Sequence, residues 1–284
     1  MMGSTPVVGE LLSVGELAPG CTTLEFRAPT LIAGLRPGHA LHVVRPESGG
    51  FRLRRVAPIS RIDLLRGSVE VALQPRIDGG QDALTSLRPG ERIDLIGPIG
   101  QPISLNKSTM RLLLIADVEG FAWVRALAFA AASAGISVTL VQEGETAADL
   151  PPARLLPEAV EILVATRDGS VGHQGSAADL LADVVLWADQ AVVAGGGEIR
   201  TAATAAALRR RSPSRSTVRG TPVATRASTG GDRAPWLQVL LSHEIGCGIG
   251  ACGGCTVTSR SGQVRLCREG PAIDPMGSTS KVGA

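Results

Sequence analysis

Apolar residues in the first hundred positions occur in short stretches that are separated by proline and glycine. Examples are TTLEFRA, ALHVV, SVEVAL and ERIDLIG, and the turn sequence RPG occurs at 36–38 and again at 88–90. Short apolar runs bounded by turn residues are typical of β-strands. Residues 1–106 are therefore predicted to form a small antiparallel β-barrel.

The pattern lengthens in the next part of the chain, over residues 107–208. The apolar runs MRLLLIA, SVTLVQ, EILVAT and AVVAG are expected to be strands. Helical stretches are predicted between and after them, at 123–134, after Ala147, near 176–181 and at 199–211. Strands that alternate with helices indicate an α/β domain with a parallel sheet. The predicted fold class is α+β multidomain: barrel, α/β domain and a small C-terminal domain.

Residues 209–233 separate the α/β domain from the C-terminal part of the chain, 234–284. The segment carries seven arginines and one aspartate among many Ser, Thr, Pro and Gly residues. This composition is typical of a flexible insertion. A solvated linker and a docking segment for an acidic partner both fit it.

Four of the five cysteines fall within 21 residues near the C-terminus, in the spacing C-x4-C-x2-C-x11-C. This is the plant-type order of a 2Fe-2S cluster. The glycines of GCGIGACGGC would let backbone N–H groups approach the sulfurs. Strands at 256–258 and 263–266 are predicted to form a hairpin that returns the last cysteine to the loop. The predicted ligands are Cys247, Cys252, Cys255 and Cys267.

Two other interpretations of the four cysteines stay open. A zinc site usually has two C-x2-C pairs, and this segment has one. A pair of disulfides is disfavoured in a reducing compartment. The fifth cysteine, Cys21, is expected to be a small buried apolar residue.

Charge and composition exclude several classes of partner. The chain has 28 Lys and Arg against 26 Asp and Glu, a net charge of +2, which would not draw it onto nucleic acid or an anionic membrane. Aromatic residues make up 2%, so a base-stacking surface is not expected. The apolar runs are far shorter than the ~20 residues that span a bilayer, and no basic-then-apolar leader opens the chain. A cytoplasmic protein is predicted.

The order of the three modules, with CGIGACGGC and with CREGPAIDP at 267–275, resembles the ferredoxin-reductase-like electron-transfer subunit of type B dihydroorotate dehydrogenase. The resemblance implies a 2Fe-2S cluster on the four cysteines, an FAD in the barrel and a partner oxidoreductase subunit in pyrimidine biosynthesis. Related reductases that feed hydrogenases, sulfur reductases and transhydrogenases share this layout. The partner and the pathway therefore stay open.

Two elements of the family's flavin site have changed in this sequence. The family's Arg-x-Tyr/Phe-Ser/Thr stretch aligns with Arg55-Val56-Ala57-Pro58, so the arginine is kept and the aromatic and hydroxyl groups are absent. The family's Gly-x-Gly-Thr matches only through Gly79, Gly80 and Gln81. FAD binding is therefore expected to be weak, and a strand-flanking role for Arg55 stays open.

The expected nicotinamide site departs further from the family. Its glycine-rich loop is replaced by Ala116, Asp117 and Val118, so Cβ atoms and a carboxylate, with Glu119 beside them, stand where pyrophosphate would approach a helix start. The later AVVAGGGEIRTA retains a glycine turn before a helix. NAD(P)H binding by this chain alone is not expected.

The sequence thus predicts an electron-transfer subunit that passes electrons between its cluster and a partner oxidoreductase. A second hypothesis is a non-catalytic scaffold or assembly subunit that keeps the cluster and has lost FAD and NAD(P)H binding. A third, a zinc-stapled module that binds RNA, is disfavoured because aromatic residues are scarce.

Overall fold

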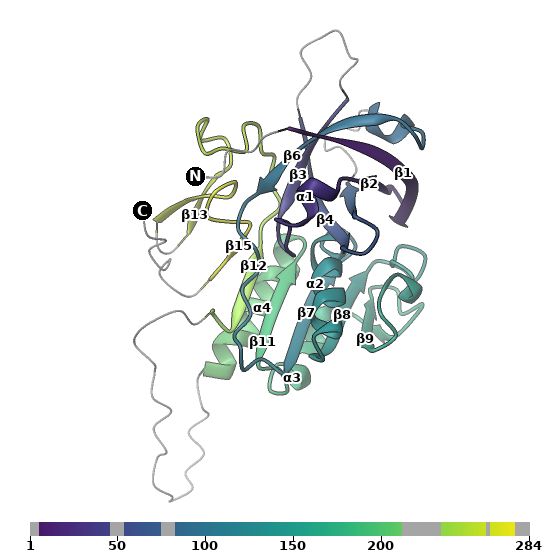
Figure 1. Cartoon of the computed structure of the whole chain (residues 1–284). Coiled ribbons are helices and arrows are strands. Elements are labelled where there is room, and N and C mark those ends of the chain that lie inside the picture. The colour runs from purple at the N-terminus through teal and green to yellow at the C-terminus, as the bar shows by residue number, and fades with distance from the viewer. Residues whose placement is uncertain (1–5, 46–53, 75–82, 212–233, 260–261, 276–284) are drawn as a thin grey trace, which may run out of the picture.

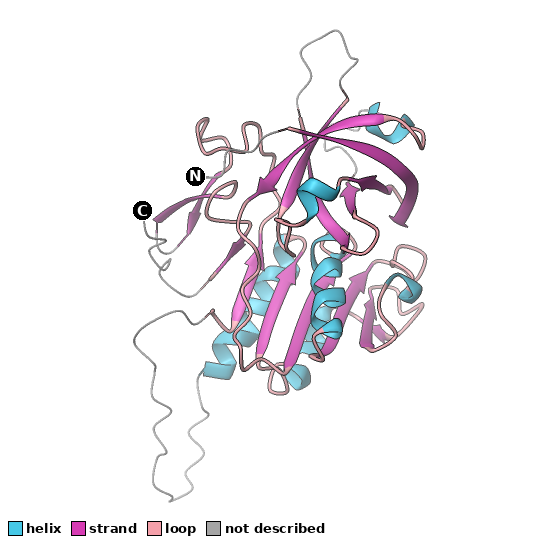
Figure 2. Cartoon of the chain, in the orientation of Figure 1, coloured by secondary structure: helices cyan, strands magenta, loops and turns pink. Residues whose placement is uncertain are grey.

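The computed structural model describes residues 6–45, 54–74, 83–211, 234–259 and 262–275. These residues form a closed barrel, a seven-stranded sheet with helices on both faces, and a two-stranded hairpin (Figures 1 and 2). The predicted fold class, with its antiparallel barrel and its parallel sheet, is confirmed.

Six antiparallel strands close the barrel in the order β1-β2-β5-β4-β3-β6. Alternate residues of these strands, such as Leu24 and Phe26, are fully buried and form its apolar interior. This arrangement explains why the sequence shows short apolar stretches with a period of two. The barrel strands are β1 (Val7–Ala18), β2 (Cys21–Arg27), β3 (Ala40–Val44), β4 (Arg55–Asp63), β5 (Ser68–Leu73) and β6 (Arg92–Ile99). Two short helical turns accompany them, α1 (Pro29–Ile32) and η1 (Ala83–Ser86).

The second sheet has the order β10-β9-β8-β7-β11-β12-β15 and is parallel except at β15. Its strands are β7 (Arg111–Asp117), β8 (Ser137–Gly144), β9 (Val160–Thr166), β10 (His173–Gln174), β11 (Gln190–Ala194), β12 (Leu237–Leu240) and β15 (Ala272–Ile273). Leu112 and Leu114 pack in the core with α2 (Phe121–Ser133), and Leu113 and Ile115 pack with α3 (Ala177–Val184) and α4 (Gly197–Arg211). Burial on both faces explains the continuous apolar run of β7.

One sequence prediction for this domain is wrong. The helix expected after Ala147 is wrong, because the described chain there contains only the short turn η2 (Ala153–Leu155). Pro151, Pro152 and Pro157 cluster around this turn and interrupt helical hydrogen bonding. Strand β12, which lies within the C-terminal range 234–284, pairs in parallel with β11 and extends the α/β sheet.

Helix α4 reaches into the segment predicted to be a flexible insertion. Arg210 donates hydrogen bonds to the carbonyls of Val185 (3.1 Å) and Ala188 (3.2 Å), and its guanidinium lies 4.8 Å from the ring centroid of Trp236. The rest of the predicted insertion, 212–233, lies outside the described residues.

A buried arginine joins the barrel to the α/β domain. Arg125 of α2 is 4% exposed and donates to Glu70 of β5 and to Ser60 of β4. Burial lowers its pKa, while the adjacent Glu70 carboxylate favours the charged form. Because an unpaired charge would be costly at this depth, the ion pair sets how α2 sits on the barrel.

Candidate functional site

The cysteine segment begins where β12 ends and is held by both larger units. Its hairpin consists of β13 (Thr256–Ser259) and β14 (Gly262–Arg265), which confirms the predicted strand pair. The carbonyl of Cys267 accepts a hydrogen bond from Gly100 N–H (3.2 Å), and Gln101 Nε2 donates to the carbonyl of Arg268 (2.9 Å). The fourth cysteine therefore lies against the chain that leaves the barrel.

The loop between the first two cysteines depends on its glycines. Gly248 and Gly250 have φ angles of +70° and +79°, which a residue with a Cβ atom rarely adopts. A Cβ at Gly250 would also stand 2.8 Å from Cγ of Arg268. The predicted need for glycine at these two positions is confirmed by the backbone.

The four thiols gather in two pairs with different surroundings. Cys247 is half-buried and Cys252 is exposed, and their side chains interact. Cys255 and Cys267 are 2% and 3% exposed and also interact with each other. All five cysteines of the chain are free thiols in the structure.

Backbone N–H groups and burial affect these thiols in opposite directions. At Cys247 burial opposes ionisation, but N–H groups of Cys252, Ile249 and Ala251 together lower the pKa to about 6. At Cys267 burial and the neighbouring Cys255 raise the pKa to about 12. The loop thus supplies donors that favour thiolate at its exposed end.

The four thiols form the donor set of the cysteine segment. Within the described ranges, no group of three or more His, Cys, Asp or Glu side chains is placed to hold one metal ion. Four thiols in two pairs match the ligand demand of a 2Fe-2S cluster, in which two iron ions share four cysteines. A structural zinc ion needs its four ligands around one centre.

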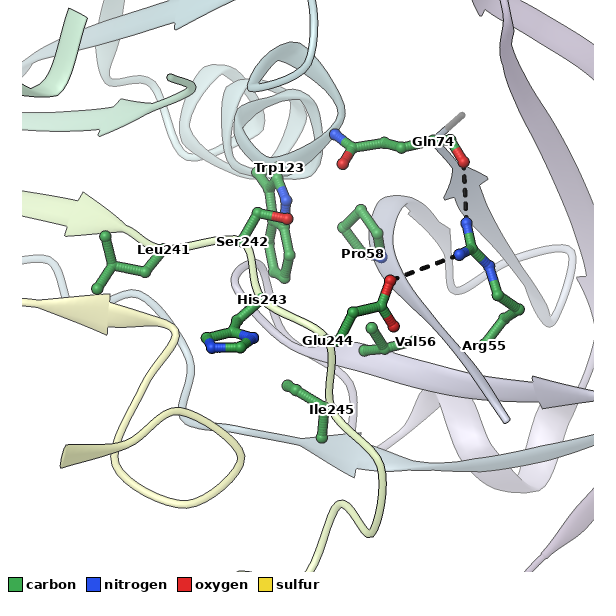
Figure 3. A pocket seen from close by; sticks show the side chains of 10 residues that line it. All are labelled: Arg55, Val56, Pro58, Gln74, Trp123, Leu241, Ser242, His243, Glu244 and Ile245. Atoms are coloured by element: carbon green, nitrogen blue, oxygen red, sulfur yellow. Dashed lines mark hydrogen bonds and ion pairs between the residues drawn. The ribbon is translucent and has the colours of Figure 1, made fainter. Parts of the chain in front are cut away.

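A pocket lies between the barrel and the chain that leads to the cysteines (Figure 3). Its empty space, which includes open solvent, is about 660 Å³. Strand β4 forms one wall, the segment 241–245 forms another, and α2 contributes one side chain. The lining residues are Arg55, Val56, Pro58, Gln74, Trp123, Leu241, Ser242, His243, Glu244 and Ile245.

The structure separates the residues predicted for FAD. Arg55 and Pro58 line the pocket, and Arg55 donates to the carbonyl of Gln74 (2.9 Å) and lies 3.7 Å from the carboxylate of Glu244. Ala57 does not line the pocket: it is fully buried in the barrel core. Three further candidates lie outside the described residues: Gly79, Gly80 and Gln81.

Trp123 is a pocket residue that the sequence analysis did not identify, because it stands at the start of an alanine-rich helix and fits an ordinary core position. Its side chain is 5% exposed, and its indole N–H has no hydrogen-bond partner among the residues that the structure describes. A buried donor without a partner is costly, so a ligand with an acceptor would fit here. The indole therefore offers a flat aromatic face and a hydrogen-bond donor at this pocket.

A buried histidine connects the barrel to the cysteine segment. His42 of β3 is fully buried, and its Nε2–H donates to the carbonyl of Ile245 at 2.6 Å. Burial lowers the pKa of the His42 ring despite this hydrogen bond. A Cβ added to Gly248 would lie 2.9 Å from Cε1 of His42, which places this ring against the cysteine loop.

The expected dinucleotide position is filled by the protein itself. Asp117, the last residue of β7, accepts hydrogen bonds from Gly120 N–H (2.7 Å) before α2 and from Gly196 N–H (2.6 Å) before α4. A Cβ on Gly195 would come within 2.4 Å of this carboxylate. These are the N–H groups that a pyrophosphate would need. The residues present therefore do not fit a dinucleotide.

The iron–sulfur cluster binding domain of dihydroorotate dehydrogenase B matches residues 243–275. The electron transfer subunit of dihydroorotate dehydrogenase B (NAD(+)) from Desulforamulus reducens is 28% identical over 93% of this chain and 94% of the relative. The corresponding subunit from Shouchella clausii is 27% identical over 85% of each. The resemblance to this subunit is confirmed.

Solved structures support the same fold. The structure of an NADH-dependent reduced ferredoxin-NADP oxidoreductase, described for flavin-based electron bifurcation, superposes with a TM-score of 0.71 at 22% identity and covers 96% of this chain and 89% of that one. A ferredoxin reductase of carbazole 1,9a-dioxygenase gives 0.61 at 18% identity, over 74% of this chain and 67% of that one. The barrel and α/β sheet are therefore of the ferredoxin-reductase type. Among the described helices, none is long and apolar enough to cross a membrane.

Proposed function

We propose that this chain is the electron-transfer subunit of an oxidoreductase and passes single electrons between its cluster and a partner subunit. The cluster ligands in this proposal are Cys247, Cys252, Cys255 and Cys267. The observation that carries it is the set of four free thiols, three on the glycine-rich loop and one after the hairpin, within the segment that matches a known cluster domain. When bound, a 2Fe-2S cluster accepts and releases one electron at a time.

The protein's own groups prepare this site. Backbone N–H groups around Cys247 favour the thiolate form, and Cys267 N–H lies 3.4 Å from the sulfur of Cys255. Such donors offset the negative charge of thiolates and sulfides. The buried pair is shielded from solvent, whereas the exposed Cys252 end faces outward, where a redox partner can approach.

We propose FAD as the second redox group, with its ring in the pocket beside β4. Arg55 and Pro58 line this pocket, and Gly79, Gly80 and Gln81 stay candidate phosphate contacts. Ala57 offers no contact from the barrel interior. Ile245 lines the pocket and stands two residues before Cys247, so the backbone joins the two sites over at most roughly 7 Å.

The proposed partner is an oxidoreductase subunit, and a dihydroorotate dehydrogenase catalytic subunit is the first candidate because the relatives carry that name. Electrons enter and leave through protein partners, since Asp117 occupies the dinucleotide position. We also propose a cytoplasmic location, where reducing conditions keep cysteines available as ligands. The division at 1–106, 107–208, 209–233 and 234–284 stays a proposal.

The scaffold hypothesis, in which the chain has lost redox function, is not favoured by the comparisons. The relatives are electron transfer subunits, and the matched segment is a cluster binding domain. Folding alone does not require four cysteines at this spacing.

Anaerobic purification followed by iron, sulfide and flavin analysis tests the proposal. We expect about two iron and two sulfide per chain and, after reduction, the EPR signal of a 2Fe-2S centre. Stoichiometric zinc without visible absorbance would contradict the cluster. Absence of flavin beside an intact cluster signal would contradict only the second redox group.

A further inference from the structure

The unpartnered indole of Trp123 is the clearest sign of a ligand contact outside the cysteine loop. The side chain is only 5% exposed, yet it lines the pocket, and its N–H donates to no described group. The other two tryptophans differ: Trp236 donates to the carbonyl of Ala188 at 3.2 Å, and Trp187 lies 5.9 Å from the Arg111 guanidinium. Neither lines the pocket.

The position of Trp123 compensates for what the barrel lacks. Strand β4 presents Val56 and Pro58 to the pocket, and neither offers an aromatic face or a side-chain donor. Trp123 reaches the same pocket from α2, which packs against β4. Figure 3 shows its indole among the side chains that line the pocket. An aromatic ring and a donor are therefore supplied from the α/β domain.

We infer that Trp123 is a flavin-positioning residue whose indole contacts the flavin ring and donates its N–H to an acceptor on it. The inference rests on the flavin part of the proposed function. A flavin ring is planar and carries nitrogen and oxygen acceptors along its edge, so it meets both demands of the indole. Arg55 lines the same pocket, but its guanidinium already donates to the carbonyl of Gln74 and pairs with the carboxylate of Glu244.

Riboflavin binding to the full chain with its cluster in place tests this assignment, because riboflavin has the ring and lacks the pyrophosphate. The protein is first freed of endogenous flavin, and the titration follows flavin fluorescence. Trp123→Phe keeps an aromatic ring and removes the donor, so we expect about tenfold weaker binding, equivalent to about 1.4 kcal/mol. Trp123→Leu removes both and is expected to weaken binding about 100-fold.

Two further measurements separate a ligand contact from a structural role. The reduction potential of bound flavin should fall in Trp123→Phe, because the lost N–H donor favours the electron-rich reduced ring. Trp187→Phe is the matched control and should change neither the affinity nor the potential. Circular dichroism and cluster absorbance should be the same in the wild type and in both phenylalanine variants.

The outcomes are distinguishable. Equal riboflavin affinity and potential in the wild type and both Trp123 variants would overturn the assignment and leave the proposed function intact. No riboflavin binding by the wild-type chain, beside a normal 2Fe-2S signal, would overturn it together with the flavin proposal. Displacement of riboflavin by AMP would show that the pocket selects a purine, which also contradicts the inference.

Discussion

The cysteine loop and the paired starts of α2 and α4 are both places where backbone N–H groups converge, but they treat those donors differently. In the loop, N–H groups of Ile249, Ala251 and Cys252 are directed at the Cys247 thiol. At the helix starts, the N–H groups of Gly120 and Gly196 are taken by the carboxylate of Asp117. The N–H groups of the cysteine loop thus interact with sulfur, whereas those at the starts of α2 and α4 are already bonded to the Asp117 carboxylate.

The difference shows that a chain can share a fold with its relatives without sharing every binding site of that fold. Both regions keep their glycine turns, but one acidic residue is enough to satisfy donors that would otherwise receive phosphate. The polarity of a helix start therefore has to be examined together with the side chains within reach of it.

The largest effect is expected from removing a cluster ligand. Cys252→Ser should abolish or severely reduce the visible absorbance and the EPR signal, because a hydroxyl is a poor replacement for a thiolate at iron. Cys21→Ala is the matched control, since Cys21 is buried in the barrel, where its pKa is raised to about 12 by burial and nearby carboxylates. A wild-type spectrum in Cys252→Ser would remove this residue from the ligand set.

The second prediction concerns the starts of α2 and α4, where the carboxylate of Asp117 accepts hydrogen bonds from the backbone N–H groups. The wild-type chain is expected to show no NADH or NADPH binding by isothermal titration, because a pyrophosphate would meet the Asp117 carboxylate. Asp117→Gly, combined with Ala116→Gly and Val118→Gly, frees the N–H donors and should give a Kd below about 1 mM.

Asp117→Asn is the control for this test, because it removes the charge and leaves the side chain in place; no binding is expected. Micromolar binding by the unmodified chain would show that the dinucleotide bypasses this position.

The third prediction concerns His39 in the barrel, which belongs neither to the cysteine loop nor to the starts of α2 and α4. Burial and Arg36 lower the pKa of His39 from 6.5 to about 4, so the unfolded chain takes up this proton first as the pH falls. The contribution of neutral, buried His39 to the free energy of unfolding is fully present above pH 6.5. It decreases as the pH falls from 6.5 to about 4. Wild type should lose about 2 to 3 kcal/mol more than His39→Gln between pH 7 and pH 4 in urea unfolding. Parallel pH curves would contradict the assignment.

The smallest effect is expected from replacing one glycine by alanine in each of the two regions. Gly250→Ala forces a Cβ into a φ of +79° and against Arg268, so we expect a loss of about 1–2 kcal/mol and faster release of the cluster on dilution with chelator. Gly197→Ala, at the start of α4, has open space around the added Cβ and should be neutral or slightly stabilising. Equal behaviour of the two variants would mean that the loop tolerates side chains.

Much of the fold follows from local pattern. Barrel strands and sheet strands were predictable because their burial repeats directly in sequence, as in TTLEFRA and MRLLLIA. The helix after Ala147 failed because prolines outweigh the apolar content there. The placement of β12 could not be predicted, since its four residues join the sheet through pairing with β11 and β15, which lie far away in the chain.

The candidate site was predictable where residue spacing carries the chemistry. Cysteine spacing points to a cluster, and the carboxylate of Asp117 points to a blocked helix start. The donor from Gly196 could not be inferred, because it comes from 79 residues away. Trp123 was missed because its place near the start of an alanine-rich helix fits an ordinary core position, and because Ser242 to Glu244, which line the same pocket, are distant in sequence.

The hydrogen bond from His42 to Ile245 has a consequence for how the molecule opens. It joins strand β3 of the barrel to the chain two residues before Cys247, so the cysteine loop and the barrel are expected to exchange their amide hydrogens as one cooperative unit. On slow heating, bleaching of the cluster should therefore coincide with melting of the barrel, and the colour of the protein becomes a direct readout of barrel integrity.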